Sequence, residues 1–443
     1  MNIGTRRFFL QSSVAATFTA ATILRNPSLA WATHPQSTSA KLRFGVNYVP
    51  RKHWLYGWLD WDRQSVAEDL QAIAALGMDH IRVQCLWSIF QPGINYVSET
   101  VLERLHTLLD IADTAGLDVE VTVLNGWMSG MSFLPAWVQP LTPKRNIFTD
   151  PEIVQAEDLL FTRIASVISL HPRFLGFDIG NELPVLQHLN NPVTSPDADA
   201  WAEHKFGLCN QIAPGKLHVN GVDHKPWFSD FGFTRQNLAT TGGASILHCY
   251  GFFTGALQRF GLTGVGNYHL IEYMTEFAYA YQADLARKVW VEEVGVAGAG
   301  DELTSETAMG EYMDQLIRNG VGTGKLWGFT WWGSHDIDRG IKGFASLEYP
   351  LGLIGQDNKP KPLGKKFAAL AAEMRKSSSI DSRRTVALVV PDLGLGGNTP
   401  GPDWTYGDRF MKLVVEGKTP AIVLESRSKD EAYLRARGIK ELV

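Results

Sequence analysis

The stretch FLGFDIGNELP, residues 174–184, joins an apolar run to an abrupt polar ending. Its mostly apolar first half predicts a buried β-strand that runs to Ile179. The chain then changes abruptly to polar and turn-forming residues, namely Gly180, Asn181, Glu182 and Pro184. A buried strand that ends on such residues is typical of a parallel barrel, in which the strand ends open into a mouth.

Seven further strand-like runs lie along the chain, and helical patterns separate most of them. They cover residues 43–48, 80–87, 118–124, 216–220, 245–250, 289–294 and 325–332. Such alternation predicts parallel strands joined by crossover helices. Eight units favour an α/β fold of the closed (β/α)8 (TIM) barrel type over an open doubly wound sheet. No glycine-rich nucleotide-binding motif follows an early strand, which weakens the open-sheet alternative further.

The chain continues beyond the eighth helix, and we expect two regions after the N-terminal segment. The barrel should occupy residues 41–376, and the serines at 377–379 mark its end. Residues 383–443 predict a small C-terminal α/β unit with two or three strands. Because so small a unit is marginally stable alone, it should dock on the barrel or on another subunit, and the second case would make the protein an oligomer.

The first 32 residues have the features of an export signal. Residues 5–10, TRRFFL, resemble the bacterial twin-arginine motif, and residues 30–32, AWA, match an A-x-A cleavage pattern. The apolar stretch between them contains Gln11, Ser12 and Ser13 and is too polar for a good membrane anchor. We therefore expect residues 1–32 to be removed and the mature protein to be periplasmic or extracellular, with no membrane partner.

Composition narrows the class of partner. The chain is 45% hydrophobic and carries a net charge of -5, and outside the signal it has no basic run longer than a pair. A nucleic-acid partner is therefore not expected. The chain contains 14 Trp, 22 Phe and 12 Tyr, the residue types that stack against sugar rings. Cys85, Cys209 and Cys249 have no C-x-x-C spacing, and we expect them to be reduced core thiols.

A specific set of side chains lies at the strand ends, where we expect the mouth of the barrel. These are Arg82, Asn181, Glu182, His248, Tyr250, Glu292, Glu293, Trp331 and Trp332. Two carboxylates on different sides of one mouth are what glycoside hydrolysis requires, one to protonate the leaving oxygen and one to attack or stabilise the anomeric carbon. Burial and mutual repulsion should raise the pKa of both glutamates. A tryptophan at the mouth offers an apolar face to a sugar ring.

Several of these stretches resemble the glycoside hydrolase clan A barrels, most closely family 5, the cellulase and mannanase group. They are IRVQCLWSIFQP (81–92), FLGFDIGNELP (174–184), HCYGF (248–252), VWVEEVGVAG (289–298) and FTWW (329–332). The resemblance implies Glu182 as acid/base and Glu293 as nucleophile of a retaining double displacement. It implies no metal and no organic cofactor.

The resemblance also assigns roles to the neighbours of the two glutamates. It implies that Asn181 bonds the sugar 2-hydroxyl, that Arg82 supports the nucleophile and that Tyr250 orients it. His248 would lie beside the acid, and Trp331 or Trp332 would form the sugar platform. We favour Glu293 over Glu292 because neighbours on a strand point to opposite faces. The two tryptophans cannot be separated in this way.

The region after the third strand departs from the family pattern. Many members carry a histidine there, whereas this chain has LNGWMSGMSFLPAW (124–137), with Asn125 and Trp127. We expect a distinct subgroup in which Trp127 contacts substrate. The C-terminal unit also resembles the domain that follows the barrel in family 42 β-galactosidases.

The sequence therefore predicts a retaining β-glycosidase that acts on a β-linked glycan or oligosaccharide of the mannan or glucan type. The alternatives are a non-catalytic carbohydrate-binding barrel and a family 42-like β-galactosidase. A metal-dependent hydrolase is a third, weaker alternative, since no His/Asp cluster lies at the strand ends. Long loops at 125–150 and 252–268 favour exo action or short substrates.

Overall fold

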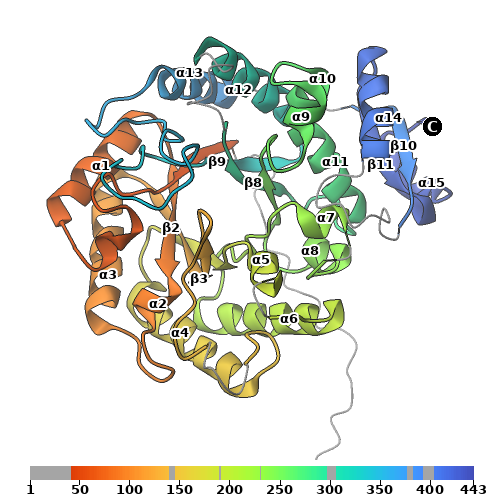
Figure 1. Cartoon of the computed structure of the whole chain (residues 1–443). Helices are drawn as coiled ribbons and strands as arrows, with labels where there is room; N and C mark the ends of the chain where they lie inside the picture. Colours follow the sequence, from red (N-terminus) through yellow and green to blue (C-terminus); the bar gives the residue numbers. More distant parts are fainter. Residues whose placement is uncertain are drawn as a thin grey trace, which may run out of the picture. The chain divides into compact units, whose positions relative to one another are not determined.

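The apolar runs form the strands of one parallel sheet, and the helices lie outside it (Figure 1). The computed structural model describes residues 41–138, 145–188, 191–229, 231–296, 306–376, 383–392 and 404–443. The predicted signal at 1–32 and the serines at 377–379 lie outside the described residues. The strand order is β6-β3-β2-β1-β9-β8-β7. The strands are β1 (Arg43–Asn47), β2 (His80–Leu86), β3 (Asp118–Asn125), β6 (Phe174–Gly180), β7 (Ser245–Cys249), β8 (Val289–Val294) and β9 (Leu326–Trp331).

The eighth predicted run, residues 216–220, lies beside β6, the last strand at one edge of the sheet. Val219 forms a single parallel bridge to Asp178. Its amide donates to Phe177 O at 2.8 Å, and its carbonyl accepts from Ile179 N at 2.9 Å. Seven parallel strands with this short eighth segment beside β6 confirm the predicted (β/α)8 barrel class.

The helices cover the outside of the sheet and are specified locally by their caps. Asp150 shows how, since its side chain accepts from the amides of Glu152 and Ile153 while Pro151 occupies the first turn. The long helices are α1 (Arg63–Ala75), α3 (Glu99–Ala115), α4 (Pro151–Ile168), α6 (Ser195–Ile212), α11 (Leu270–Tyr281), α12 (Glu306–Val321) and α13 (Pro362–Lys376). Between these lie η1 (Trp54–Trp58), α2 (Trp87–Phe90), α5 (Leu183–His188), α7 (Lys225–Phe228), α8 (Arg235–Thr240), α9 (Ala256–Phe260) and α10 (Val265–Tyr268).

The C-terminal segment forms a second, smaller parallel sheet in the order β11-β10-β12. Its elements are β10 (Val386–Val390), α14 (Trp404–Val415), β11 (Pro420–Leu424), α15 (Glu431–Arg437) and β12 (Glu441–Leu442). It packs beside α11 of the barrel (Figure 1). Glu276 of α11 is fully buried and pairs with Arg384 at 3.1 Å and Arg437 at 2.9 Å. These ion pairs fasten the C-terminal unit to the barrel.

Two further observations bear on the expectations from sequence. Cys85, Cys209 and Cys249 are buried free thiols. Among the described residues, no helix has both the length and the apolar character needed to cross a membrane.

Candidate active site

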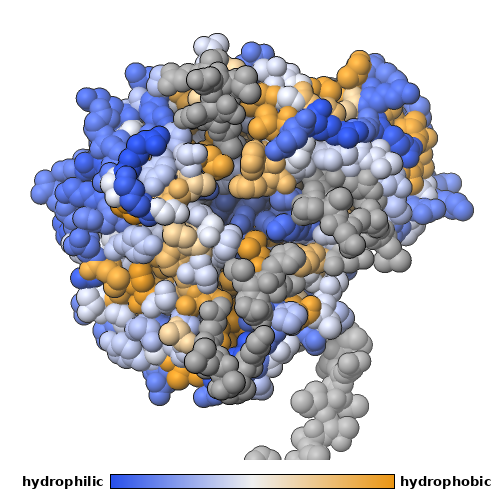
Figure 2. Space-filling model, in the orientation of Figure 1, coloured by the Kyte–Doolittle hydropathy of each residue, from blue (hydrophilic) through white to orange (hydrophobic). Residues whose placement is uncertain are grey.

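The predicted mouth residues gather where the barrel strands end. In Figure 1 the segments that follow the strands, such as α2, α5 and the β4–β5 hairpin (Trp127–Met128 and Met131–Ser132), lie toward the viewer. Figure 2 shows the same face with a hollow near its centre, hydrophilic within and bordered by hydrophobic patches. One apolar cluster there includes Trp54, Phe133, Tyr250, Trp332 and Tyr349.

Glu182 and Glu293 face each other across this mouth. One carboxylate oxygen of each lies within 4.8 Å of the other and of a ring nitrogen of His248. Two carboxyl groups this close together can act on the same glycosidic bond. The Glu182 side chain is 21% exposed and that of Glu293 is 6% exposed, which leaves both accessible from the mouth.

The backbone at Glu182 is in the left-handed region, with φ of 45°. That conformation is costly for a residue with a Cβ atom, and such strain concentrates at functional positions. Gly180 before it packs tightly, because a Cβ there would lie 2.7 Å from a Leu183 methyl carbon and 2.9 Å from Leu124 O. The strand-to-helix turn at 180–183 is thus built to aim Glu182 into the mouth.

Arg82 on β2 is fully buried and organises the floor of the site. Its Nη1 donates to Glu293 Oε1 at 2.6 Å, and its Nη2 donates to Asp178 Oδ2 at 2.6 Å and Asn181 Oδ1 at 3.0 Å. A planar guanidinium can bridge carboxylates on different strands in this way, whereas a lysine cannot. The guanidinium therefore fixes the orientation of Glu293 and Asn181 together.

Tyr250, directly after β7, holds the other oxygen of Glu293. Its hydroxyl donates to Glu293 Oε2 at 2.8 Å. Burial and the charge of Glu293 raise the pKa of Tyr250 well above its ordinary value, so the phenol remains a donor at all working pH values. Glu293 thus receives one hydrogen bond on each oxygen.

His248 connects three glutamates. Its Nδ1 lies 2.9 Å from Glu182 Oε1 and 3.5 Å from Glu293 Oε2, and its Nε2 lies 3.0 Å from Glu292 Oε2. Burial alone would lower the pKa of the imidazole, but the charge of Glu293 and the bonds to Glu182 and Glu292 outweigh it and raise the pKa to about 10. With this pKa, His248 is an imidazolium at neutral pH.

This imidazolium corrects one expectation from sequence, that burial raises the pKa of both glutamates. For Glu293 burial does outweigh the nearby His248 and Arg82 cations, and its pKa is raised. For Glu182 burial acts in the same direction, but the hydrogen bond and charge of His248 overcome it, and its pKa is lowered. The pKa values of the two glutamates are therefore shifted in opposite directions, which favours Glu293 for a proton that the pair shares.

Glu292 and Glu293 both contact Arg82 and His248, so strict alternation of neighbours to opposite faces does not hold here. Glu292 Oε2 lies 3.5 Å from Arg82 Nη2, and Glu293 Oε1 lies 2.6 Å from Arg82 Nη1. The reason is an irregular register, which shifts between Leu247 and His248 on β7 and again between Val291 and Val294 on β8 against β9. Local register of this kind carries no sequence signal.

The structure separates the two tryptophans that the sequence leaves equal. Trp331 is 1% exposed, packs on Phe367 of α13 at 5.4 Å, and donates Nε1 to Leu351 O. Trp332 is 7% exposed and shares the mouth cluster with Tyr250. Trp332 is therefore the candidate sugar platform, and Trp331 faces the helix layer.

The loop after β3 contacts the site residue Asn181 through a backbone carbonyl. The carbonyl of Trp127 accepts from Asn181 Nδ2 at 2.9 Å, which fixes the amide opposite its bond from Arg82. Asn125 donates to Gln84 Oε1 at 2.9 Å inside the barrel. The Trp127 ring is half-buried against the core. This loop supports Asn181 through the backbone of Trp127, and substrate contact by the Trp127 side chain stays a prediction.

Three carboxyl groups near the site are absent from the residues predicted by sequence. Asp178 and Glu120 are fully buried under Arg82, and burial together with the charge of Glu292 raises the pKa of Asp178 to about 6. Glu348 follows β9, accepts from Ser129 Oγ at 3.2 Å and bonds Trp332. Burial raises the pKa of Glu348 to about 6, and the charges of Glu293 and Glu182 add to the shift. Asp178 lies three residues before Asn181 on a predicted strand, which is a usable signal, whereas Glu348 lies on a loop.

Glu182, His248 and Glu293 are spaced closely enough to be tested as metal ligands. The donor set does not fit, because both ring nitrogens of His248 already bond carboxylates and the ring is charged. An imidazolium has no free lone pair for a metal. The geometry suits proton transfer instead.

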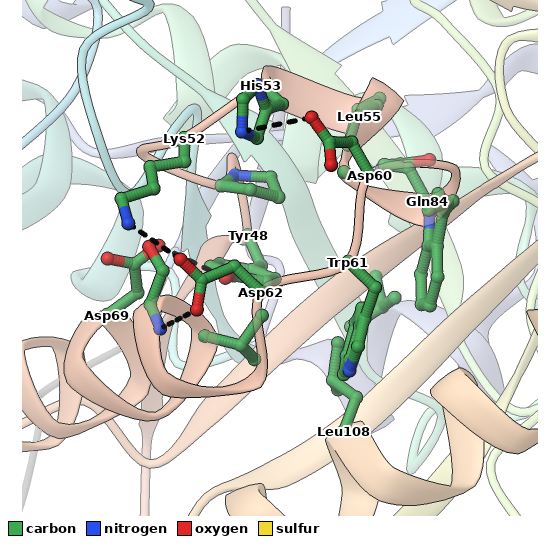
Figure 3. A pocket seen from close by; sticks show the side chains of 16 residues that line it. Tyr48, Lys52, His53, Leu55, Asp60, Trp61, Asp62, Asp69, Gln84 and Leu108 are labelled. Atoms are coloured by element: carbon green, nitrogen blue, oxygen red, sulfur yellow. Dashed lines mark hydrogen bonds and ion pairs between the residues drawn. The ribbon is translucent and has the colours of Figure 1, made fainter.

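A separate cavity lies beside the loop after β1 (Figure 3). Its lining includes Tyr48, Trp61, Asp69, Gln84 and Leu108, and it is crossed by the ion pairs Lys52–Asp62 and His53–Asp60. None of the mouth carboxylates lines it. The cavity is a crevice between α1, α3 and the outside of the barrel.

The barrel, with two facing glutamates and an aromatic wall at its mouth, defines the class of the protein as a (β/α)8 glycoside hydrolase. No protein-family model matches the chain, and no curated protein does. Solved structures do match. A GH5_18 enzyme from Streptomyces cattleya in complex with Manβ1-4GlcNAc is 35% identical, covers 91% of this chain and 98% of its own, and has a TM-score of 0.85.

A second GH5_18 structure, from Bifidobacterium longum subsp. longum ATCC 55813 in complex with the same disaccharide, is 30% identical. It covers 91% of this chain and 95% of its own, with a TM-score of 0.82. The exo-β-1,4-mannosidase Op5Man5 from Opitutaceae bacterium strain TAV5 shares the fold at 23% identity, 86% and 69% coverage and a TM-score of 0.74. The chain belongs to the GH5_18 glycoside hydrolases of family 5, and the predicted family and enzyme class are confirmed.

Proposed function

We propose that the protein is a retaining β-mannosidase that cleaves short β-mannosides such as Manβ1-4GlcNAc. The observation that carries this proposal is the pair Glu182 and Glu293, whose oxygens lie within 4.8 Å at the mouth of the barrel. The sugar is inferred from the disaccharide bound by the two GH5_18 relatives. The alternative of a non-catalytic binder loses support, because both glutamates keep their hydrogen-bonding partners.

In the first step Glu293 attacks the anomeric carbon and Glu182 protonates the departing oxygen. A covalent glycosyl–enzyme ester forms on Glu293, and the aglycone leaves as an alcohol. Arg82 and Tyr250 each hold one oxygen of Glu293, so the carboxylate is aligned before the substrate arrives. In the second step Glu182 takes a proton from water, which attacks the same carbon and restores Glu293.

The first step needs the proton on Glu182, whereas the opposite pKa shifts of the two glutamates favour the proton on Glu293. His248 Nδ1 lies 2.9 Å from Glu182 and 3.5 Å from Glu293. The imidazolium can therefore pass its Nδ1 proton to Glu182 and take one from Glu293, with no change in the number of protons. Positive charge that develops at the anomeric carbon favours the ionised form of Glu293 and drives the transfer.

Asn181 and Trp332 would hold the sugar at the cleavage site. Asn181 is oriented by Arg82 on its oxygen and by Trp127 O on its nitrogen, and its remaining amide hydrogen can meet the 2-hydroxyl. Trp332 offers its ring face beside Tyr250. We further propose, from the twin-arginine motif, that the enzyme acts outside the cytoplasm.

The test uses the purified wild-type enzyme with Manβ1-4GlcNAc and with aryl β-mannoside, β-glucoside and β-galactoside. We expect the mannosides to be cleaved fastest and proton NMR of the first product to show the β anomer. Glu182→Gln and Glu293→Gln should each lose orders of magnitude in kcat on the disaccharide and keep the wild-type circular dichroism spectrum. Turnover by either variant at the wild-type rate, or a first product with inverted configuration, would overturn the proposal.

A further inference from the structure

The mechanism above uses His248 but gives no role to Glu292, the buried carboxylate behind it. Glu292 is fully buried, and its Oε2 lies 3.0 Å from His248 Nε2. A buried carboxylate is expensive unless it is paired. Glu292 is paired with Nε2 of the His248 ring, and the other ring nitrogen, Nδ1, contacts Glu182, the proposed acid/base.

We propose that Glu292 is a positioning residue that keeps His248 charged and, through it, sets the protonation of Glu182. This inference rests on the proposed function and deepens it. The three groups form one line, in which the Glu292 carboxylate accepts from Nε2 and the Glu182 carboxylate accepts from Nδ1. With both nitrogens donating to carboxylates, the ring holds two protons and a positive charge.

Glu120 completes the arrangement from β3. It is fully buried. Burial together with the charge of Glu292 raises the pKa of Glu120 well above its ordinary value. For Glu292, the charges of Arg82 and His248 outweigh burial and lower the pKa. Glu120 is therefore the neutral member of the pair, and Glu292 is the carboxylate that faces His248.

Other charged groups around His248 also affect its pKa, but none of those described here bonds Nε2 in place of Glu292. From the remaining elements these are Arg82 on β2, Asp178 on β6, Glu293 on β8, Tyr250 after β7, and Asp223, His224 and Lys225 near Glu182. Glu293 lies 3.5 Å from Nδ1, on the same side as Glu182. Only Glu292 among the described residues accepts from Nε2. Without it, the ring can become neutral and still donate Nδ1–H to Glu182.

Removal of the Glu292 charge should shift the pH dependence of catalysis in one direction. Glu292→Gln should let His248 lose a proton near neutral pH, which removes the cation that contacts Glu182. Glu182 and Glu293 then hold their shared proton more tightly, and the basic limb of the kcat/KM profile should move up by about one pH unit. Glu120→Gln is the matched control, because it replaces one neutral buried group by another of nearly the same shape, and both readouts should stay at their wild-type values.

The first measurement needs no substrate. In ¹⁵N-histidine-labelled protein, the His248 signals, assigned with a His248→Gln sample, should show two protonated ring nitrogens at pH 8 in the wild type and in Glu120→Gln. In Glu292→Gln one nitrogen should be unprotonated at that pH. A neutral His248 in the wild type, or a ring that stays doubly protonated in Glu292→Gln, would overturn the inference.

The kinetic measurement follows the basic limb of kcat/KM in the same variants. Glu292→Asp keeps the negative charge but moves it farther from His248, because its side chain is shorter. The basic limb of kcat/KM for Glu292→Asp should therefore lie between those of the wild type and Glu292→Gln. This variant replaces Glu292→Gln in the test if Glu292→Gln does not fold. An unshifted limb in both Glu292 variants would contradict the inference. A protein with the predicted NMR states but no turnover of any β-glycoside would instead refute the proposed function, so the two failures are distinguishable.

Discussion

Replacement of Tyr250 by phenylalanine tests the alignment of the proposed nucleophile with little disturbance of the fold. The hydroxyl donates to Glu293 Oε2 at 2.8 Å, and the ring packs on Phe253 at a centroid distance of 5.6 Å. Phenylalanine keeps the ring and removes only the donor. Arg82 still donates to the other oxygen of Glu293 at 2.6 Å.

The expected loss of kcat/KM in Tyr250→Phe follows from the hydrogen bond between the Tyr250 hydroxyl and Glu293. A hydrogen bond to a charged group contributes about 1.5 to 3 kcal/mol, which corresponds to a loss of about 10-fold to about 150-fold in kcat/KM if it acts fully in the transition state. The loss should fall on kcat more than on KM, because the hydroxyl touches the attacking carboxylate. Removal of the donor also favours protonated Glu293, so the acid limb of the profile should move to higher pH.

The assay is steady-state hydrolysis of an aryl β-mannoside between pH 4 and about pH 9, with thermal unfolding as the control for folding. We expect a melting temperature within a few degrees of the wild type, since the residue keeps its packing. Unchanged kcat/KM and an unchanged acid limb in a folded Tyr250→Phe variant would refute the role given to this hydroxyl.

Four further substitutions give independent tests. Trp332→Ala should lower kcat/KM about tenfold on mannosides, whereas Trp331→Phe should change the melting temperature and leave KM unchanged, because only Trp332 borders the mouth. Glu348→Gln removes a negative charge near both mouth glutamates, so the basic limb of kcat/KM should move to lower pH, and an unmoved limb would contradict the electrostatic contact. Glu276, with three cations around it, has a pKa lowered to about 2 despite burial, so its stabilising effect is complete above its unfolded pKa and is lost as the pH falls toward 2. Glu276→Gln should therefore lower the melting temperature strongly at pH 7 and much less at pH 3, and an equal loss at both would count against the ion pairs.

Periodicity was sufficient to predict the barrel, because each strand is a short apolar run that ends in polar residues. The stretch 174–184 could place Glu182 at a strand end, and the same pattern at 289–294 could place Glu293 at another. The run at 216–220 was also predicted as a strand, although it forms only one bridge to β6. These features depend on the local pattern of side chains, which a sequence displays directly.

The protonation of the site could not be predicted in the same way. It depends on His248, which lies between three glutamates from two strands, and on a register shift that brings Glu292 and Glu293 to the same partners. These protonation states depend on distances between residues that lie far apart in the chain, and the sequence pattern does not reveal those distances. The position of Glu348 beside Trp332 has the same origin, since it depends on how a long loop folds over the mouth.

Capture of the covalent intermediate would identify the nucleophile of the proposed reaction. The enzyme is incubated with a 2-deoxy-2-fluoro-β-mannosyl fluoride, which forms the glycosyl ester quickly and releases it slowly, and is then digested for peptide mass spectrometry. We expect one added fluorosugar per chain, attached to Glu293. A label on Glu292 or on another residue, or no label on an enzyme that cleaves mannosides, would contradict it.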